Sequence, residues 1–265
     1  MKSKRLWLLT LLLPMLIFLV ACQQATTKTT DNQSGTSSQT KNTITVKDLL
    51  TKVKKANTDV TSMNVDVALG ITGSSNSLAK NQEIKGELIY NKENADLTKG
   101  HLVLNMTQGD QKTYQEIIMP GGENLPVYSR SSKDGKWTKQ VQSQNSSYYI
   151  QPDYFKLLKA LSSMSDDDLR LKEERDDYVV SLKNQNTDLI GLFGKEFDLE
   201  LTGITQADMQ KELTVKFDKK NFYFKEFQLK LSYDGDKGKL EITTDVTYSS
   251  WNKVDENSIT EPKDI

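Results

Sequence analysis

The sequence predicts an α+β domain built around an antiparallel β-sheet. Three observations support this class: a helical apolar stripe opens the ordered region, alternating strands follow it, and three long alternating strands close the chain. Alternation with a period of two is typical of antiparallel strands buried on one face. The hydrophobic fraction is 36% and no second linker interrupts the ordered region, so we expect one domain over residues 45–265.

The ordered region is expected to begin with a helix. Thr45 and Asp48 have the form of a capping box in which Asp replaces the usual Glu or Gln. Apolar residues then recur at helical spacing on one face, at Leu49, Leu50, Val53, Ala56 and Val60. From residue 62 the period changes to two, which predicts strands at 63–71, 84–90 and 102–106, and a weaker one at 114–119. Residues 127–137 predict a hairpin that turns at Asp134-Gly135.

A second helix is expected near the middle of the chain. Pro152 suits a first helical turn, and the apolar face would consist of Tyr154, Leu157, Leu158, Leu161 and Met164. Residues 178–182 predict a strand, and residues 188–197 predict a short helix or an apolar loop. A closing meander is expected over 213–217, 227–233 and 240–248, with turns at 218–221 and 234–238.

The first 22 residues have the pattern of an export signal. Three basic residues precede an uncharged run, 6–20, that is shorter than the roughly 20 apolar residues of a spanning helix and is interrupted by Pro14. The run ends in Leu19, Val20, Ala21 and Cys22, which resembles the bacterial lipobox. We therefore expect residues 1–21 to be a signal peptide and Cys22 to carry an S-diacylglycerol group, with or without N-acylation. The alternative is a secretory signal or anchor helix in which Cys22 is incidental.

Residues 22–44 are expected to be the lipidated Cys followed by a disordered polar tether. Residues 23–42 are almost all Thr, Gln, Ser, Lys, Asn and Asp, without an apolar period. A flexible coil of about 20 residues has a root-mean-square reach of roughly 25 Å. The predicted location is the extracytoplasmic face of the cell membrane, with the membrane itself as a partner through the lipid anchor.

Composition excludes several classes of function. The chain has 35 Lys and Arg against 36 Asp and Glu, so it has no excess of positive charge. This balance argues against a nucleic-acid-binding protein. Cys22 is the only cysteine and His101 the only histidine, which leaves no intrachain disulfide, no Cys-rich zinc site and little material for Ser-His or Cys-His catalysis. We predict no catalytic residue, no metal and no cofactor, and we expect His101 to be a surface or edge residue.

Three further patterns have competing interpretations. The acidic residues between 166 and 177 are a candidate Ca²⁺ site or, more simply, a solvated face. Residues 234–236 resemble the start of an EF-hand loop, but Lys239 and Asp245 stand where Gly and Glu belong, which favours a hairpin turn. Residues 121–122 and 191–195 are rich in Gly but lack the spacing of a phosphate-binding loop, so both are predicted to be loops.

The order of elements, ending in Tyr248-Ser249-Ser250-Trp251 and a polar tail with Pro262, is similar to that of the LolA/LppX-like lipoprotein-carrier superfamily. Among its branches the chain most resembles Gram-positive lipoproteins of the DUF6612 type, over residues 45–265. The resemblance rests on element order and the closing meander. It implies an incomplete β-barrel of about ten strands, curled around an apolar concavity, with helices covering the concave side. Such a concavity would hold acyl chains of lipids or lipoproteins. The resemblance implies no catalytic residues.

The leading functional hypothesis is binding or carriage of a lipid or another apolar ligand without catalysis. Residues expected to line the concavity are Val65, Val67, Leu102 and Leu104. The aromatic residues are candidates for the cavity or for the core, and the core is favoured at alternating positions; they are Tyr148, Tyr149, Phe222, Tyr223, Phe224, Phe227 and Tyr233. A second hypothesis is a non-enzymatic module that docks an envelope protein as a sensor or chaperone, and a third is a hydrolase, motivated only by abundant carboxylates.

Overall fold

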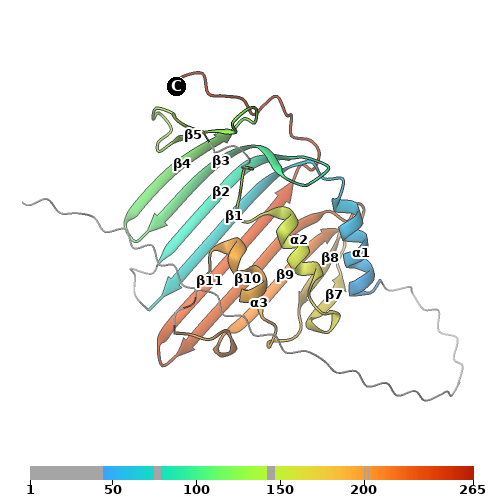
Figure 1. Cartoon of the computed structure of the whole chain (residues 1–265). Helices are drawn as coiled ribbons and strands as arrows, with labels where there is room; N and C mark the ends of the chain where they lie inside the picture. Colours follow the sequence, from blue (N-terminus) through green and yellow to red (C-terminus); the bar gives the residue numbers. More distant parts are fainter. Residues whose placement is uncertain (1–43, 75–78, 142–146, 200, 202) are drawn as a thin grey trace, which may run out of the picture. The chain divides into compact units, whose positions relative to one another are not determined.

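Eleven antiparallel strands form one sheet, in the spatial order β6-β5-β4-β3-β2-β1-β11-β10-β9-β8-β7 (Figure 1). The computed structural model describes residues 44–74, 79–141, 147–199, 201 and 203–265, all within the compact unit Thr43–Ile265. The predicted signal peptide, the lipobox with Cys22 and the tether up to residue 43 lie outside the described residues. The strands are β1 (Ser62–Gly73), β2 (Lys80–Tyr90), β3 (Leu97–Gln108), β4 (Gln111–Met119), β5 (Pro126–Arg130), β6 (Thr138–Val141), β7 (Leu169–Glu173), β8 (Asp177–Leu182), β9 (Gln210–Asp218), β10 (Phe224–Gly235) and β11 (Gly238–Ser249).

Two meanders meet at the centre of this sheet. Strands β1 to β6 succeed one another on one side, and β11 back to β7 do so on the other. The first and last strands join the halves, with Val67 of β1 opposite Val246 of β11. Both ends of the domain therefore contribute to the middle of the sheet, where the apolar alternation of the sequence is strongest.

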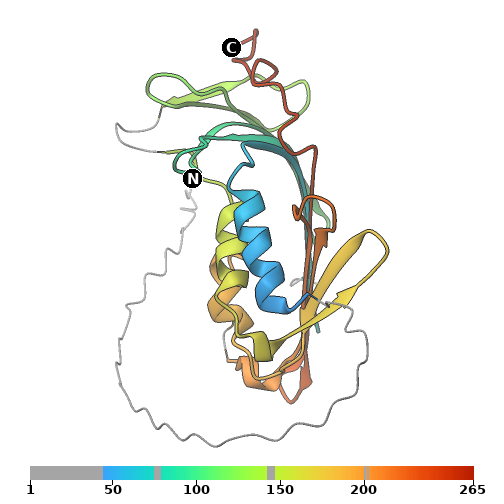
Figure 2. The same cartoon turned by 90° about the vertical axis from the view of Figure 1, so that its right-hand side faces the viewer.

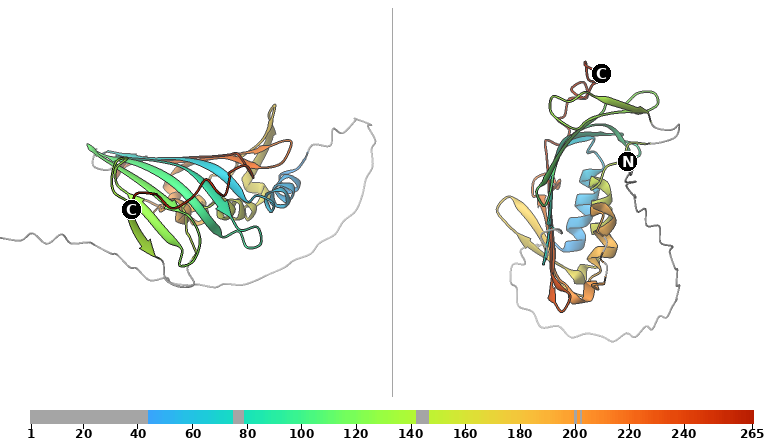
Figure 3. Two further views of the ribbon diagram at one scale, coloured as in Figure 1. Left: turned by 90° about the horizontal axis from the view of Figure 1, so that it is seen from above. Right: turned by 90° about the vertical axis from the view of Figure 1, so that its left-hand side faces the viewer.

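The helices form a layer on one face of the sheet (Figures 2 and 3). The ring of Tyr154 meets that of Tyr248 edge-on with centroids 4.7 Å apart, and the rings of Phe193 and Phe197 lie 5.0 and 5.4 Å from that of Phe227. The core therefore lies between the helices and the central strands. The α-helices are α1 (Val46–Asn57), α2 (Tyr154–Ser162) and α3 (Leu189–Phe193), and the short 3₁₀-helices are η2 (Asp166–Asp168), η3 (Gly194–Phe197) and η4 (Gln206–Asp208).

Helix α1 forms where the capping box and the apolar stripe predict it. The backbone N–H of Asp48 donates to Thr45 Oγ1 at 3.1 Å, and Leu49, Leu50 and Val53 are buried against the sheet. Ile44, the last residue of the predicted tether, is partly buried against the core, so core packing begins one residue before Thr45.

The prediction of an antiparallel sheet with helices on one side is confirmed, but two details differ. The sheet has one strand more than expected, because the five residues of β7 include only one buried side chain, Leu169, and show little alternation. The sheet is open, as expected for an incomplete barrel, because its short edge strands, β6 and β7, stand at opposite ends of the strand order. The expected strong curl around a concavity is absent from the described strands. It bends towards the helices at its β3–β5 end (Figure 2).

Three local predictions also need correction. The hairpin strands are β5 and β6, so the connection spans residues 131–137 and Trp137 lies outside the strands, against the Arg130 guanidinium at 4.6 Å. Helix α2 begins after the N-cap Asp153, which places Pro152 just outside its first turn. Residues 191–195 are helical, in α3 and η3, because the N-cap Asp188 accepts a hydrogen bond from the Gly191 N–H at 2.6 Å.

Candidate functional site: the cleft between α1 and α2

The four residues predicted to line a cavity share the helix-bearing face of the sheet. Strand register aligns Val65, Gly86 and Leu102 in one row across β1, β2 and β3, and Val67, Ile84 and Leu104 in the next. Val65, Val67 and Leu102 are only 2–6% exposed, and Leu104 is partly buried against the same core. The register thus brings the four together, and three of them are already covered by neighbouring side chains.

A small cavity opens beside this row. It has a volume of about 230 Å³ and lies between β1, β2 and η3, with Val67, Ile84 and Phe197 among its apolar lining residues and Glu196 and Asp198 among its polar ones. Ligand sites for drug-sized molecules are typically about 300–1,000 Å³. This cavity is therefore too small to hold a lipid in the conformation described here.

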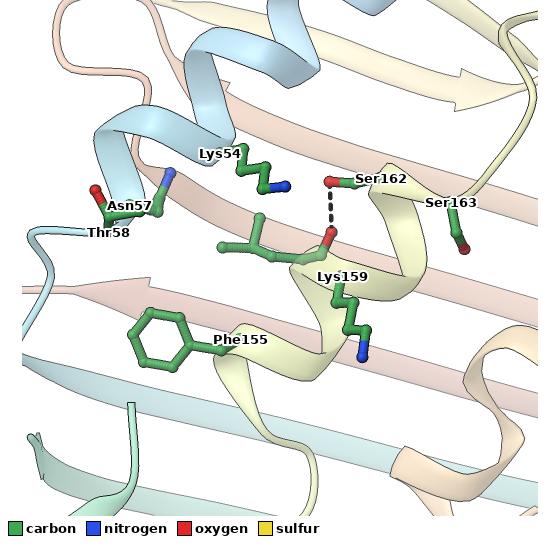
Figure 4. A pocket seen from close by; sticks show the side chains of 8 residues that line it. Lys54, Asn57, Thr58, Phe155, Lys159, Ser162 and Ser163 are labelled. Atoms are coloured by element: carbon green, nitrogen blue, oxygen red, sulfur yellow. Dashed lines mark hydrogen bonds between the residues drawn. The ribbon is translucent and has the colours of Figure 1, made fainter. Parts of the chain in front are cut away.

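A larger, mainly apolar cleft separates α1 from α2. Its volume is about 470 Å³, and Figure 4 shows the side chains around it. Phe155 and Leu158 of α2 supply its apolar surface, while Lys54 and Lys159 extend from the two helices beside it. The remaining lining residues are Asn57, Thr58, Ser162 and Ser163. An apolar surface with a few polar groups is the usual composition of a binding site for an organic molecule.

The buried side chain of Asn57 connects the two helices at the base of the cleft. Asn57 is 2% exposed and donates through Nδ2 to the carbonyl oxygens of Val53, at 2.7 Å, and Phe222, at 3.0 Å. Its Oδ1 accepts a hydrogen bond from the Tyr154 hydroxyl. Burial raises the pKa of Tyr154, so this hydroxyl keeps its proton and remains a donor. Asn57 therefore links α1, α2 and the β9–β10 turn, and it sets the spacing of the two helices.

A depression of about 600 Å³ at the β10–β11 turn is larger but has a different lining. Asp208, Asp234, Lys239 and Glu241 surround it, and Lys239 Nζ is already paired with Asp234 Oδ2 at 2.7 Å. Charged groups that are satisfied by one another offer little to an apolar ligand. The α1–α2 cleft is therefore the better candidate for such a ligand.

His101 lies on the face of the sheet opposite to the helices, in β3, which is not an edge strand. Its Nε2 is 2.8 Å from Glu116 Oε1, and the other carboxylate oxygen accepts hydrogen bonds from the Tyr114 hydroxyl at 2.8 Å and from Arg130 Nε at 2.7 Å. Burial alone would raise the pKa of Glu116, but these three partners hold it below its ordinary value. Both carboxylate oxygens of Glu116 therefore have partners within the fold.

The other sequence candidates occupy structural positions. Asp166, Asp167 and Asp168 form η2, and no group of three His, Cys, Asp or Glu side chains in the described ranges could hold a metal ion. Residues 234–236 lie in the β10–β11 hairpin. Among the aromatic candidates, the buried residues are Tyr148, Phe224, Phe227 and Tyr233, the partly buried ones are Phe222 and Tyr223, and the exposed one is Tyr149.

No sequence pattern predicted a site at the residues of the α1–α2 cleft. Leu158 was expected on the apolar face of α2, but Lys54 and Lys159 belong to polar faces more than 100 residues apart in the sequence. Only the packing of α2 beside α1 brings them together. A usable signal was present in the composition of the two helices, which is rich in lysine and almost free of acidic residues.

Comparison with family models gives one match, to a family of unknown function, over residues 45–265. The chain belongs to the DUF6612 family. A comparison with curated proteins gives no match. None of the helices in the part of this DUF6612 protein that the structure describes has the length and apolar content needed to cross a membrane.

Solved structures similar to this chain include two mycobacterial proteins, LprF and the lipoprotein LppX. LprF from Mycobacterium bovis shares 14% identity, with 82% of this chain and 96% of that chain covered and a TM-score of 0.48. LppX from Mycobacterium tuberculosis shares 15% identity, with coverages of 78% and 96% and a TM-score of 0.33. A DUF1329 family protein from Desulfovibrio piger shares 7% identity, with coverages of 81% and 95% and a TM-score of 0.27.

Proposed function

We propose that this DUF6612 protein is a lipid-anchored protein of the extracytoplasmic membrane face that binds an apolar or amphipathic ligand, such as a lipid, without catalysis. The observation that carries the proposal is the mainly apolar cleft of about 470 Å³ between α1 and α2. In this proposal residues 1–21 are a signal peptide, Cys22 carries the acyl chains, residues 23–44 are the tether, and residues 45–265 form a LolA-like binding domain.

The chemistry of the cleft supports an amphipathic ligand. An acyl chain in contact with Phe155 and Leu158 would gain about 0.8 kcal/mol for each buried CH₂ group. The ammonium groups of Lys54 and Lys159 lie beside this apolar surface, where a polar or anionic head would meet them. Val65, Val67, Leu102 and Leu104 would join the site only if α2 and α3 moved away from the sheet, which would open it into the predicted concavity.

Ligand uptake can be tested directly. The chain from residue 22, carrying Cys22→Ser so that it cannot be acylated, would be purified without detergent and analysed by native mass spectrometry, then titrated with a fluorescent fatty acid. We expect a co-purifying lipid or saturable uptake of the added fatty acid. A protein that arrives empty and binds neither fatty acid nor phospholipid would contradict the proposal.

Two matched substitutions locate the ligand. Ser162 lines the cleft and Thr51 does not, yet each is exposed and donates its hydroxyl to the carbonyl four residues earlier in its helix, at 2.7 and 2.8 Å. Ser162→Trp should fill the cleft and weaken binding about tenfold or more, whereas Thr51→Trp should leave affinity nearly unchanged. Equal affinities for the two variants would place the ligand elsewhere.

The protein-docking alternative predicts an exposed apolar patch on the outside of the domain. Only three large apolar side chains are exposed among the described residues: Val141, Tyr149 and Ile265. No observation therefore favours that alternative over ligand binding.

A further inference from the structure

Helices α1 and α2 concentrate positive charge in a chain with a formal net charge of −1. Together they contain six lysines and one acidic residue, Asp48. All six lysines are exposed: Lys47, Lys52, Lys54, Lys55, Lys156 and Lys159. The two helices are therefore strongly basic, although the chain as a whole has a small negative net charge.

These lysines lack the acidic partners that lysines of the sheet possess. None of the six forms an ion pair with a carboxylate within the described residues. On the sheet, by contrast, Lys85 pairs with Asp66 at 3.3 Å and Lys230 pairs with Glu241 at 2.9 Å. The positive charge of the helices is therefore available to a partner outside the domain.

The helix geometry gathers four of the six lysines on one outward surface. In α2 the buried residues Tyr154, Leu157, Leu158 and Leu161 face the sheet, which leaves Lys156 and Lys159 on the opposite side. In α1 the burial of Leu49, Leu50 and Val53 directs Lys54 and Lys55 outward in the same way. The two helices lie side by side in the layer that covers the sheet (Figure 2). We call Lys54, Lys55, Lys156 and Lys159 the basic helix surface.

Neighbouring groups leave this surface positive. Asp59 pairs with Lys92 at 3.0 Å, and Asp153 is occupied as the N-cap of α2, where burial raises its pKa. The exposed acidic residues of η2 come after the end of α2. An exposed aromatic ring adjoins the surface: Tyr149 is 54% exposed and its ring centroid is 4.2 Å from Lys156 Nζ. Lysines beside an exposed Tyr are the composition that favours a membrane–water interface.

We propose that the basic helix surface docks on the anionic headgroups of a lipid bilayer. The inference rests on the proposed function, because the anchor at Cys22 would keep the domain beside the membrane. In the proposed function residues 23–44, which precede α1 in the sequence, are the tether, and a flexible coil of that length would reach roughly 25 Å. Each lysine near an anionic surface strengthens attachment about fivefold. Attachment that is weak in solution becomes effective when a tether supplies a high local concentration.

Docking in this orientation has a consequence for the ligand. Lys54 and Lys159 belong both to the basic helix surface and to the lining of the α1–α2 cleft. A docked domain would therefore hold the cleft at the level of the headgroups. An amphipathic ligand would then pass between bilayer and cleft without exposing its apolar chain to water.

The anchored protein provides the first test. The full chain, lipidated in its host and held on nanodiscs by its own acyl chains, would be labelled with an amine-reactive reagent and analysed by mass spectrometry. Labelling of the four lysines should fall severalfold on discs containing phosphatidylglycerol relative to phosphatidylcholine discs, and high salt should restore it. Lys85, Lys230 and Lys239 on the sheet are internal controls. Unchanged labelling of the four, or equal protection of the controls, would overturn the proposal.

Charge-matched variants provide the second test. In the chain carrying Cys22→Ser, K54Q/K55Q/K156Q/K159Q should weaken sedimentation with phosphatidylglycerol vesicles about six hundredfold. The variant K85Q/K172Q/K230Q/K239Q removes the same charge from exposed or partly exposed sheet positions and should lose about threefold or less. Equal losses would show a general charge effect and contradict the docking surface. Fatty-acid uptake is measured on K55Q/K156Q, because neither residue lines the cleft. This variant should lose about 25-fold in vesicle binding while its uptake persists, so docking and ligand binding can fail independently.

Discussion

The two faces of this domain use charged residues in opposite ways. On the sheet face away from the helices, opposite charges stand across neighbouring strands, as in Lys216 with Glu226 at 2.6 Å and Lys230 with Glu241 at 2.9 Å. On the helix layer, six exposed lysines form no ion pair within the described residues. Charges paired within the fold stabilise it or are neutral to it, whereas unpaired charges are available for binding. The sheet face therefore uses its charges within the fold, whereas the helix layer leaves its positive charges unpaired.

The strongest expected effect concerns the most buried charge on the sheet face. Replacing Glu116, whose side chain is 10% exposed, by Gln should lower the free energy of unfolding by about 3 kcal/mol, because Arg130 loses its partner. Urea denaturation followed by circular dichroism measures this change. The control Asp66→Asn removes an exposed partner of Lys85 and should cost less than about 1 kcal/mol. Similar costs for both variants would refute the distinction between buried and exposed pairs.

The same carboxylate should give the domain an acid-sensitive component of stability. The folded state holds the pKa of Glu116 below its ordinary value of 4.5, so the stabilisation is fully present above that pH. It should be lost as the pH falls from 4.5 through the lower pKa of the folded state. The difference in unfolding free energy between wild type and Glu116→Gln should therefore shrink on acidification. A difference that stays constant with pH would assign the loss to packing.

A buried polar contact within the helix layer should come next in size. Asn57→Ala removes the link between α1, α2 and the carbonyl of Phe222, and it should cost about 2 kcal/mol. Tyr154→Phe removes one hydroxyl from the same network and should cost about 1 kcal/mol. Urea denaturation measures both. If Asn57→Ala also weakens fatty-acid binding while Tyr154→Phe weakens it less, the spacing of the helices controls the cleft.

The smallest effect is expected for the unpaired lysines. Lys55→Gln and Lys159→Gln should each change the free energy of unfolding by less than about 0.5 kcal/mol, because an exposed side chain without a partner contributes little to stability. Thermal unfolding of both variants beside wild type is the measurement. A substantial loss of stability would mean that these lysines are structural, and it would remove the contrast between the two faces.

Local sequence patterns determined the elements of this protein. The period of 3.6 at Leu49 to Val53 and the period of two in the closing strands report which side of each element avoids water, and that information is local. The fold class, α1, α2 and the meander β9–β11 follow from it. Strand β7 did not, because a five-residue strand with one buried side chain carries almost no periodic signal.

Tertiary structure alone decided how these elements meet. Whether the sheet closes depends on the distance between its edge strands β6 and β7, which no local period encodes. Asn57 meets Tyr154 across 97 residues, and Glu116 gathers His101 and Arg130 from neighbouring strands. The sequence by itself determined which faces are apolar and that α1 and α2 are basic. The packing of α2 beside α1 turned those faces into a cleft, because burial of the two apolar stripes on one sheet leaves both lysine-bearing faces on the same side.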